Sequence, residues 1–272
     1  VIRELGAFQA FVQRLPVRAL PPRRREAVCL LSRDQDQWGV AYMAFALAKQ
    51  AGWDLTFCGP DQAAPEASLY LAPALRGIRQ IPRHRWQAIL RRIREGGTLY
   101  LSMDDGVPDQ FEALTGLSIR HRSRRKESDV EARLDGNIGV TLNFHSDYRL
   151  DLKPVRAEVL GVEADGNPLF TRARYGRGWV YFCSCSPEKT VVSRPGAFAV
   201  DAPPYWRIYD RVASAADLGR VLLRRNPSEI GLTEHPAGAR QRWWWRSITG
   251  RRRRGISSAP PAGGSRRFIG TA

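Results

Sequence analysis

The sequence predicts an α/β fold in which helices cover both faces of a mostly parallel sheet, and three observations support this prediction. Short apolar segments alternate with segments of helical periodicity through the first part of the chain. The short segments are apolar throughout, as in strands that are buried on both faces of a parallel sheet. Glycine or proline follows most of the segments, which is typical of the ends of helices and strands. This arrangement is typical of a doubly wound, flavodoxin-like sheet.

The elements of the parallel part follow one another closely. The helix over residues 85–95 has the clearest amphipathic pattern, because Trp86, Ile89, Leu90 and Ile93 share one face and arginines occupy the other. We expect strands over 27–31, 55–58, 69–73 and 98–102, and further helices over 38–51 and 108–114.

An antiparallel extension of the sheet is expected after about residue 118, where the strand-like segments begin to alternate between apolar and polar residues. Asp165-Gly166 and Gly176-Arg177-Gly178 are turn signals between such strands. The second is not a phosphate loop, because no helix follows it. We expect strands over 140–144, 149–152, 158–162, 169–175 and 179–183, then an irregular loop over 187–204 and a closing helix over 205–225.

Residues 1–25 are expected to come from a missing upstream domain, which would make the chain a fragment. Apolar residues recur at helical spacing over 3–15, and a linker with several prolines follows over 16–25. The chain has no signal-peptide pattern and no apolar run near the ~20 residues that a membrane helix needs. We therefore expect no membrane partner.

The basic charge is concentrated at the end of the chain. The 272 residues carry a net charge of +16, yet residues 237–272 contain nine arginines and no acid. Removing these arginines leaves a net charge of +7 on residues 1–236. The basic excess, which at first suggests nucleic acid, is therefore largely a property of this tail.

The residues of the tail are those expected if the gene is read in a shifted frame. Residues 241–250 read QRWWWRSITG, which matches neither a strand nor a helix pattern. Decoded one base earlier, the same bases allow VVVAINYG, a strand followed by a turn. We expect the segment after about residue 239 to be a frameshift product with little ordered structure. The alternative is a genuine basic and aromatic tail that binds polyanions.

Cysteine usage indicates a reducing compartment. Cys29, Cys58, Cys183 and Cys185 lie mostly in apolar, strand-like segments, and no two of them form a C-x-x-C pair. We predict buried thiols rather than a disulfide framework or a zinc site. A cytoplasmic location follows from this usage, and we expect neither a metal nor a cofactor.

Four aspartates are the candidates for a site that faces a ligand. Asp34 and Asp36 follow the first predicted strand, and Asp104 and Asp105 follow the fourth. Open α/β sheets bind ligands beyond the carboxyl ends of their strands. The alternatives are a solvated turn for the first pair, and for the second pair a cation site or a cap for the next helix, of which the cap is favoured.

We expect no catalytic residue in the α/β part of the chain. An amidotransferase needs a cysteine on a strained turn between strand and helix, oriented by a histidine and a carboxylate. The segment after the fourth strand reads SMDDG over residues 102–106, and neither G-x-C-x-G nor G-x-S-x-G occurs. The histidines, at positions 84, 121, 145 and 235, are scattered along the chain.

A second basic cluster lies outside the tail. It consists of Arg120, Arg122, Arg124, Arg125 and Lys126. A surface that binds nucleic acid would interleave aromatic side chains for base stacking, and this cluster has none. We interpret it as a solvated loop and do not expect a nucleic-acid partner.

The order of three motifs resembles the trimerisation domain of family 42 β-galactosidases and its relatives in cellulase-type glycoside hydrolases, which has a class I glutamine amidotransferase-like fold. The motifs are LYLAP over 69–73, GGTL over 96–99 and YGRGWVY over 175–181. The resemblance covers residues 26–225, and it is the order and spacing of the motifs that make it specific. It implies that residues 226–272 are the remnant of a small C-terminal β-sandwich, whose opening strand VVVAINYG would match.

The resemblance implies a non-catalytic accessory and oligomerisation domain of a glycoside hydrolase. In such enzymes an upstream (β/α)₈ barrel carries the two catalytic carboxylates. This chain has no Asn-Glu dipeptide, the common setting of the acid in these barrels, and no eight-fold β/α series. The implied partners are the barrel of the same parent chain and further copies of the domain, with Trp38, Trp53 and Trp206 as candidate contacts.

Two other functions remain open from the sequence. The chain could be a small amidotransferase-like or hydrolase-like enzyme, which cysteine alkylation would inactivate. It could also bind polyanions through its tail, which heparin retention before and after deletion of residues 240–272 would test.

Overall fold

The computed structural model of the chain describes residues 6, 9–10, 13, 27–77, 81–134, 139–197, 202–216, 218, 230–236, 242–248 and 268–269. The predicted N-terminal helix and linker and most of the predicted disordered tail lie outside the described residues. The frameshift after about residue 239 therefore stays a prediction.

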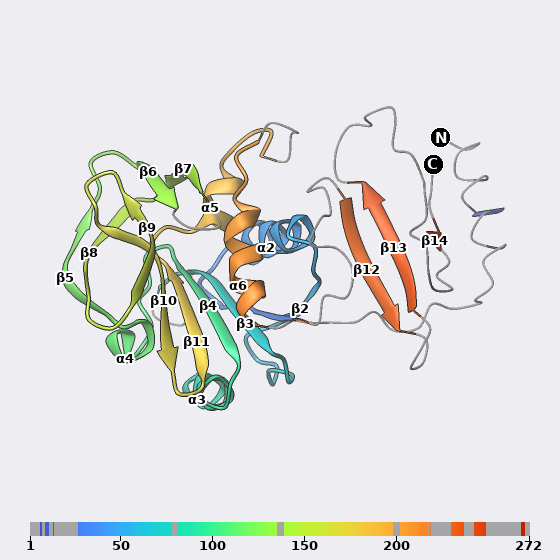
Figure 1. The fold of residues 1–272 in the computed structure, drawn as a ribbon, viewed down its shortest axis with the longest axis horizontal. Helices are drawn as coiled ribbons and strands as arrows, with labels where there is room; N and C mark the ends of the chain where they lie inside the picture. The colour runs from blue at the N-terminus through green and yellow to red at the C-terminus, as the bar shows by residue number, and fades with distance from the viewer. Residues whose placement is uncertain are drawn as a thin grey trace.

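A mixed sheet of nine strands forms the centre of the described fold (Figure 1). Its order is β2-β1-β3-β4-β11-β10-β9-β6-β7. The strands from β2 to β11 in this order are parallel, and those from β11 to β7 are antiparallel. This confirms the predicted α/β fold with an antiparallel extension. The strands are β1 (Ala27–Leu30), β2 (Leu55–Cys58), β3 (Leu69–Leu75), β4 (Thr98–Met103), β6 (Asp129–Leu134), β7 (Val140–His145), β9 (Glu158–Glu163), β10 (Pro168–Tyr175) and β11 (Gly178–Cys183).

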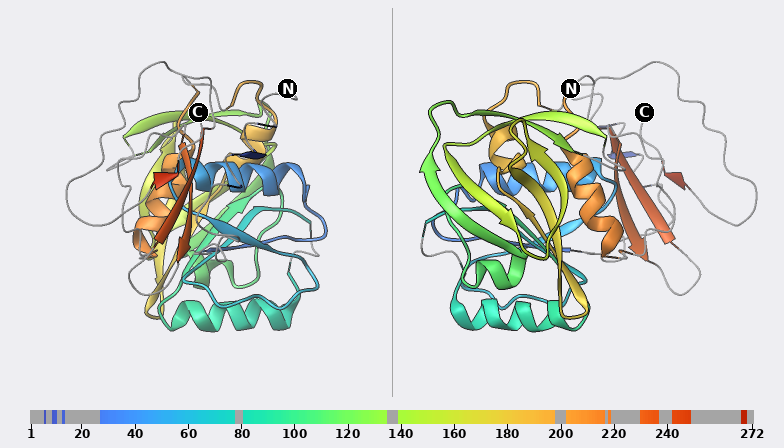
Figure 2. Two further views of the ribbon diagram at one scale, coloured as in Figure 1. Left: turned by 90° about the vertical axis from the view of Figure 1, so that its right-hand side faces the viewer. Right: turned by 60° about the vertical axis from the view of Figure 1, so that its left-hand side comes forward.

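Helices cover both faces of the parallel strands, and Figure 2 shows α2 and α3 on opposite sides of the sheet. Successive side chains of a strand point to opposite faces. Ala27 and Cys29 of β1 accordingly join one apolar cluster, and Val28 and Leu30 join the other. This two-sided burial explains why the strand is apolar throughout. The helices are α2 (Gly39–Gln50), α5 (Pro187–Val192) and α6 (Trp206–Ala215) against the first cluster, and α3 (Arg83–Arg94) and α4 (Phe111–Thr115) against the second.

The prediction of a charged loop over residues 120–126 is wrong, because most of this segment belongs to a strand. β5 (Leu117–Arg124) pairs antiparallel with β8 (Tyr148–Pro154) in a separate two-stranded sheet. Most of its charged side chains face solvent, so the strand lacks the apolar alternation that usually reveals one. Arg125 is not solvated either, since its Nη2 lies 2.6 Å from Oε1 of the buried Glu163.

Three further elements differ from the expectation. β6 was not predicted, although its DVEARL sequence alternates between exposed and buried positions as a half-buried strand should. α5 begins inside the segment expected to be an irregular loop, where Ser186 accepts a hydrogen bond from the Lys189 N–H and Pro187 takes the first helical position. α6 ends at Ala215, earlier than the closing helix was expected to end.

The described parts of the tail form strands. β12 (Ile230–Pro236) pairs antiparallel with β13 (Arg242–Ile248), and β14 (Phe268–Ile269) pairs with β13. The three tryptophans therefore lie in a strand, contrary to the expectation that their segment fits no regular pattern. Aromatic residues are common in strands, so composition alone permits this.

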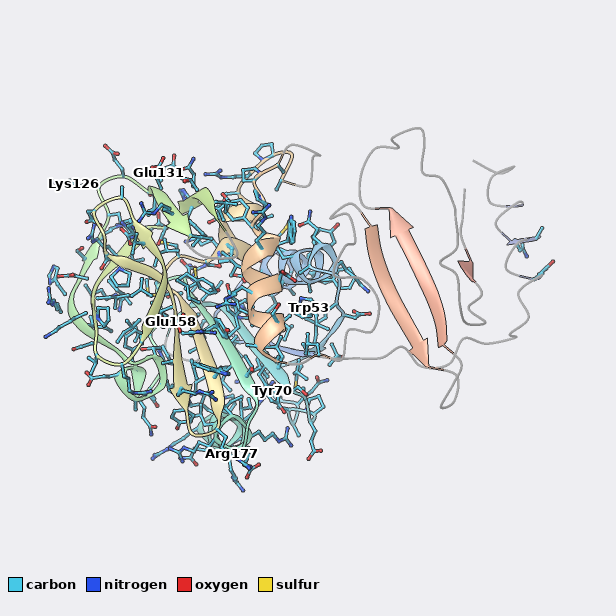
Figure 3. All side chains as sticks on the ribbon, viewed as in Figure 1. Trp53, Tyr70, Lys126, Glu131, Glu158 and Arg177 are labelled. Atoms are coloured by element: carbon cyan, nitrogen blue, oxygen red, sulfur yellow. The ribbon has the colours of Figure 1, made fainter. Side chains whose placement is uncertain are left out.

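The turn between β10 and β11 packs tightly against the end of α3. This confirms the predicted hairpin at 176–178, and Arg177 marks its position in Figure 3. A Cβ on Gly178 would lie 2.1 Å from the backbone oxygens of both Ile93 and Gly97. Gly176 has a φ of +63°, and a Cβ there would lie 2.6 Å from the Arg94 oxygen. The two glycines allow the hairpin to approach the helix this closely.

We expect Gly178→Ala to destabilise the fold, because the new methyl group would overlap rigid backbone rather than a flexible side chain. Overpacking of this kind costs about 1–3 kcal/mol or more. Gly59→Ala is the matched control, since its Cβ would meet nothing closer than 3.6 Å. Urea denaturation of both variants measures the two changes in unfolding free energy, and equal values would contradict the packing described here.

Candidate functional site

The carboxyl ends of β3 and β4 are joined by a tight set of backbone hydrogen bonds. The N–H groups of Asp104, Asp105 and Gly106 all donate to the Leu75 oxygen, at 2.9, 3.1 and 2.8 Å. Just before this point Ala74 has a φ of +45°, which a residue with a side chain rarely adopts. The strands thus end in a fixed, strained turn at the edge where open α/β sheets bind ligands.

A cleft of about 420 Å³ opens beside these strand ends. This volume lies in the range of small-molecule sites, roughly 300–1,000 Å³. The Arg122 guanidinium donates to the Asp105 backbone oxygen at 2.5 Å and so holds one wall in place. The lining residues are Leu75, Gly77, Ile81, Trp86, Asp105, Gly106, Val107, Pro108, Asp109 and Arg122.

Of the four predicted aspartates, only Asp105 lines this cleft among the described residues. Its Oδ1 accepts a hydrogen bond from the Gly77 N–H at 2.7 Å, which ties the two strand ends together. Asp34 packs against the same glycine, because a Cβ on Gly77 would lie 2.6 Å from the Asp34 Oδ2. Whether either carboxylate contacts a ligand stays a prediction.

The other two aspartates have structural partners. Asp36 accepts hydrogen bonds from the N–H groups of Trp38 and Gly39, at 3.2 and 2.9 Å, and so satisfies the beginning of α2. Asp104 lies 2.5 Å from Nζ of Lys189, which also lies 3.1 Å from Asp147. The expectation that Asp104 and Asp105 cap the next helix is wrong, since Gln110 precedes α4 and no side chain caps it.

A buried carboxylate that the sequence analysis missed lies directly behind the strand ends. Glu188 is completely buried, and its oxygens accept hydrogen bonds from four hydroxyl groups, which lie on β4, on α6 and on the residue before α5. Only the Ser-Pro-Glu helix start indicates it in the sequence, and that pattern predicts a cap rather than a cluster. The donors are Tyr209 at 2.6 Å, Ser102 and Ser186 at 2.7 Å each, and Tyr100 at 3.1 Å.

The hydroxyls of this cluster remain protonated donors. Burial, together with the adjacent Glu188 carboxylate, raises the pKa of both Tyr100 and Tyr209. No cation pairs with Glu188 among the residues that the structure describes, and a buried carboxylate in this situation needs such donors, because an unpaired charge in the interior is strongly disfavoured. The cluster connects β4, α5 and α6 in one hydrogen-bond network.

Ser102 is the residue of this cluster that stands where a nucleophile would be expected. Its Oγ donates to Glu188 and accepts from the Ala74 N–H at 2.7 Å. Activation of a serine requires an adjacent base that can take its proton, usually a histidine. No histidine among the described side chains hydrogen-bonds to Ser102 or Glu188, and Ser102 is completely buried. A substrate would have to open the fold to reach it.

The cysteines are buried, as predicted, and none forms a disulfide. Burial raises the pKa of Cys185 to about 11, although the nearby Arg125 opposes this. Burial also raises the pKa of Cys29 and Cys183. Since the thiolate is the reactive form, these thiols are unreactive at neutral pH. The described residues hold no group of three or more potential metal ligands.

No described helix is long and apolar enough to span a membrane.

The fold can be compared with known structures. No protein-family model and no curated protein matches the chain. A β-galactosidase from Bacillus circulans sp. alkalophilus matches 89% of this chain with 38% of its own length, a TM-score of 0.61 and 13% identity. A cold-adapted β-galactosidase from Rahnella sp. R3 matches 91% of this chain with 39% of its own, a TM-score of 0.67 and 12% identity.

The similarity extends to other glycosidases. A GH42 β-galactosidase from G. stearothermophilus covers 79% of this chain with 33% of its own length, a TM-score of 0.57 and 14% identity. An α-L-fucosidase from Paenibacillus thiaminolyticus covers 88% of this chain with 39% of its own length, a TM-score of 0.64 and 11% identity.

We expect Glu188→Leu to destabilise the protein by at least about 3 kcal/mol, because it leaves several buried hydroxyls without an acceptor, at about 1–3 kcal/mol each. Glu131→Leu is the control, since Glu131 is exposed on β6 and surface changes usually stay within about 0.5 kcal/mol. Denaturant unfolding separates the two, and a nearly neutral Glu188→Leu would show that the hydroxyl cluster is not needed.

We also expect Asp147 to make stability depend on pH. A hydrogen bond from Lys189 lowers the pKa of Asp147, and its burial only partly opposes this. Because the folded-state pKa lies below the unfolded value of about 3.9, the stabilisation is present above that value and is lost as the pH falls through the folded-state pKa. Asp147→Asn should flatten this part of the curve of unfolding free energy against pH, whereas an unchanged curve would refute the assignment.

The fold of this chain is thus that of one part of the family 42 β-galactosidases, and the chain spans less than two-fifths of the length of the structures that it matches.

Proposed function

We propose that the chain is a non-catalytic accessory and oligomerisation domain of a glycoside hydrolase. In this proposal the parent enzyme cleaves a glycosidic bond on a separate (β/α)₈ barrel, and this domain packs on the barrel and on further copies of itself. The observation that carries the proposal is the fold similarity, which covers most of this chain but only 33–39% of each glycosidase. A domain of this extent in a larger enzyme needs surfaces for its neighbours.

An exposed aromatic surface supports the proposed association. Trp38 is 89% exposed and Tyr42 is 61% exposed, and both belong to the beginning of α2. Val192, which is 42% exposed, extends this surface from α5, since its Cγ2 lies 3.2 Å from the Cβ position of Gly39. We call Trp38, Tyr42 and Val192 the aromatic surface. Aromatic residues at this exposure are enriched at protein interfaces.

Of the other two tryptophans expected at contacts, neither is freely exposed. Trp53 is 1% exposed and stacks on Tyr209, with ring centroids 5.7 Å apart, so its expected role at an interface is wrong. Trp206 is partly buried against the core cluster under α6. Trp38 is therefore the tryptophan that supports the proposal.

We expect the chain to self-associate in solution, and the double substitution Trp38→Ser with Tyr42→Ser to shift it toward the monomer. Removing two interface aromatics commonly costs about 2 kcal/mol or more each. Val155→Ser is the control, because Val155 is 58% exposed and its N–H donates to the oxygen of Gly116 at the end of α4, which covers the opposite face of the sheet from α2. Sedimentation equilibrium over a range of concentrations measures the mass, and a chain that is monomeric throughout would refute self-association.

A further inference from the structure

Two strained residues lie beside the cleft at the carboxyl ends of β3 and β4. Among the described residues, Ala74 and Gln110 are the non-glycine residues with a positive φ, at +45° and +57°. Ala74 precedes Leu75 and Gln110 follows Asp109, and both of these neighbours line the cleft. Backbone strain of this kind costs free energy and is concentrated at ligand sites. Its position on two separate segments of the lining indicates that the cleft is shaped for a ligand.

The rim of this cleft places two carboxylates beside a guanidinium, since Asp105, Asp109 and Arg122 all line it. Arg122 is held in place, because its Nη2 donates to the Asp105 backbone oxygen and its guanidinium lies 5.2 Å from the centre of the Tyr148 ring. Among the described residues, neither the Asp109 carboxylate nor the Nε and Nη1 atoms of Arg122 have a hydrogen-bond partner. The Asp105 carboxylate uses only Oδ1, to accept from the Gly77 N–H. The rim thus keeps both acceptors and donors for a ligand.

Much of the remaining lining is apolar. Leu75 ends β3, Ile81 lies just before α3, and Trp86 belongs to α3 itself. Val107 continues this apolar lining from the segment that follows β4. Small-molecule sites commonly combine such an apolar lining with a few polar groups that fix the orientation of the ligand. A ligand that fits here has an apolar face and a polar edge.

From these observations we infer that the cleft binds the ring of a neutral sugar. A carboxylate only accepts hydrogen bonds and a guanidinium only donates them, whereas a hydroxyl group does both and can bridge the two. Charges of both signs on one rim give little net preference for a charged ligand. The C–H groups of a sugar ring supply the apolar face, and a cleft of about 420 Å³ is large enough for a small sugar. The inference does not depend on the proposed accessory function, because it concerns a different surface.

The test compares ligands on the unmodified 272-residue chain by saturation-transfer NMR, with a titration of each ligand that binds. We expect at least one of glucose, galactose and mannose to bind. Sorbitol carries similar hydroxyl groups on an open chain and should bind about tenfold more weakly, because the chain loses more conformational freedom on binding. Binding by one of the three sugars identifies the preferred ring and supports the inference. No binding by any of them, or equally tight binding of sorbitol, would overturn it.

Two matched pairs of variants locate the binding in this cleft. Asp109→Ala and Arg122→Ala should each weaken binding of the sugar by about tenfold or more, because each removes a charged hydrogen-bonding group from the rim. Glu112→Ala and Arg120→Ala remove the same kinds of charge from nearby exposed residues outside the lining and should leave binding nearly unchanged. Circular dichroism checks that all four variants fold. Unchanged binding in both Asp109→Ala and Arg122→Ala would place the sugar elsewhere, such as on the aromatic surface, and would overturn the inference.

Discussion

The rest of the described fold depends on the buried carboxylate of Glu188, which accepts hydrogen bonds from four hydroxyl groups. It joins β4 in the centre of the sheet to α5 and α6, which cover one face. A charge in such a place is stable only while every donor stays in position. The same carboxylate engages the hydroxyl of Ser102, at the strand end where a reactive group would have to stand. One network thus holds the layers together and keeps the Ser102 hydroxyl buried.

The strand ends have the shape of a ligand site, but most of their polar groups are already used within the fold. The strand ends have the features that many α/β proteins use for ligands, namely a strained turn at Ala74 and a cleft beside Asp105. Their polar groups are largely engaged with one another, since Asp105 holds Gly77 and Asp104 pairs with Lys189. What remains available for neighbours is surface, namely the aromatic surface on α2 and α5.

Local sequence patterns predicted the parallel half of the fold well, because β1, β3 and β4 are buried on both faces and each helix has one apolar face. The predicted segment at 55–58 coincides with β2, and that at 85–95 differs from α3 by two residues at most. β5 escaped prediction because its charged side chains face solvent on a two-stranded sheet. Glu188 escaped for another reason, since three of the four hydroxyl groups that donate to it come from residues at least 21 positions away in the sequence. Asp104 was noticed, but spacing could not predict its partner Lys189, which lies 85 residues away in the sequence.

The double-mutant cycle of Ser102→Ala and Tyr209→Phe tests the central claim most directly, because both hydroxyls donate to Glu188 from different elements. If one carboxylate couples β4 to α6, the unfolding free energies of the two single variants will not add up to that of the double variant. The difference should lie within about 0.5–3 kcal/mol, as for other groups that share a hydrogen-bond network. Additivity of the two changes would contradict the account, because it would mean that the layers are held together independently of Glu188.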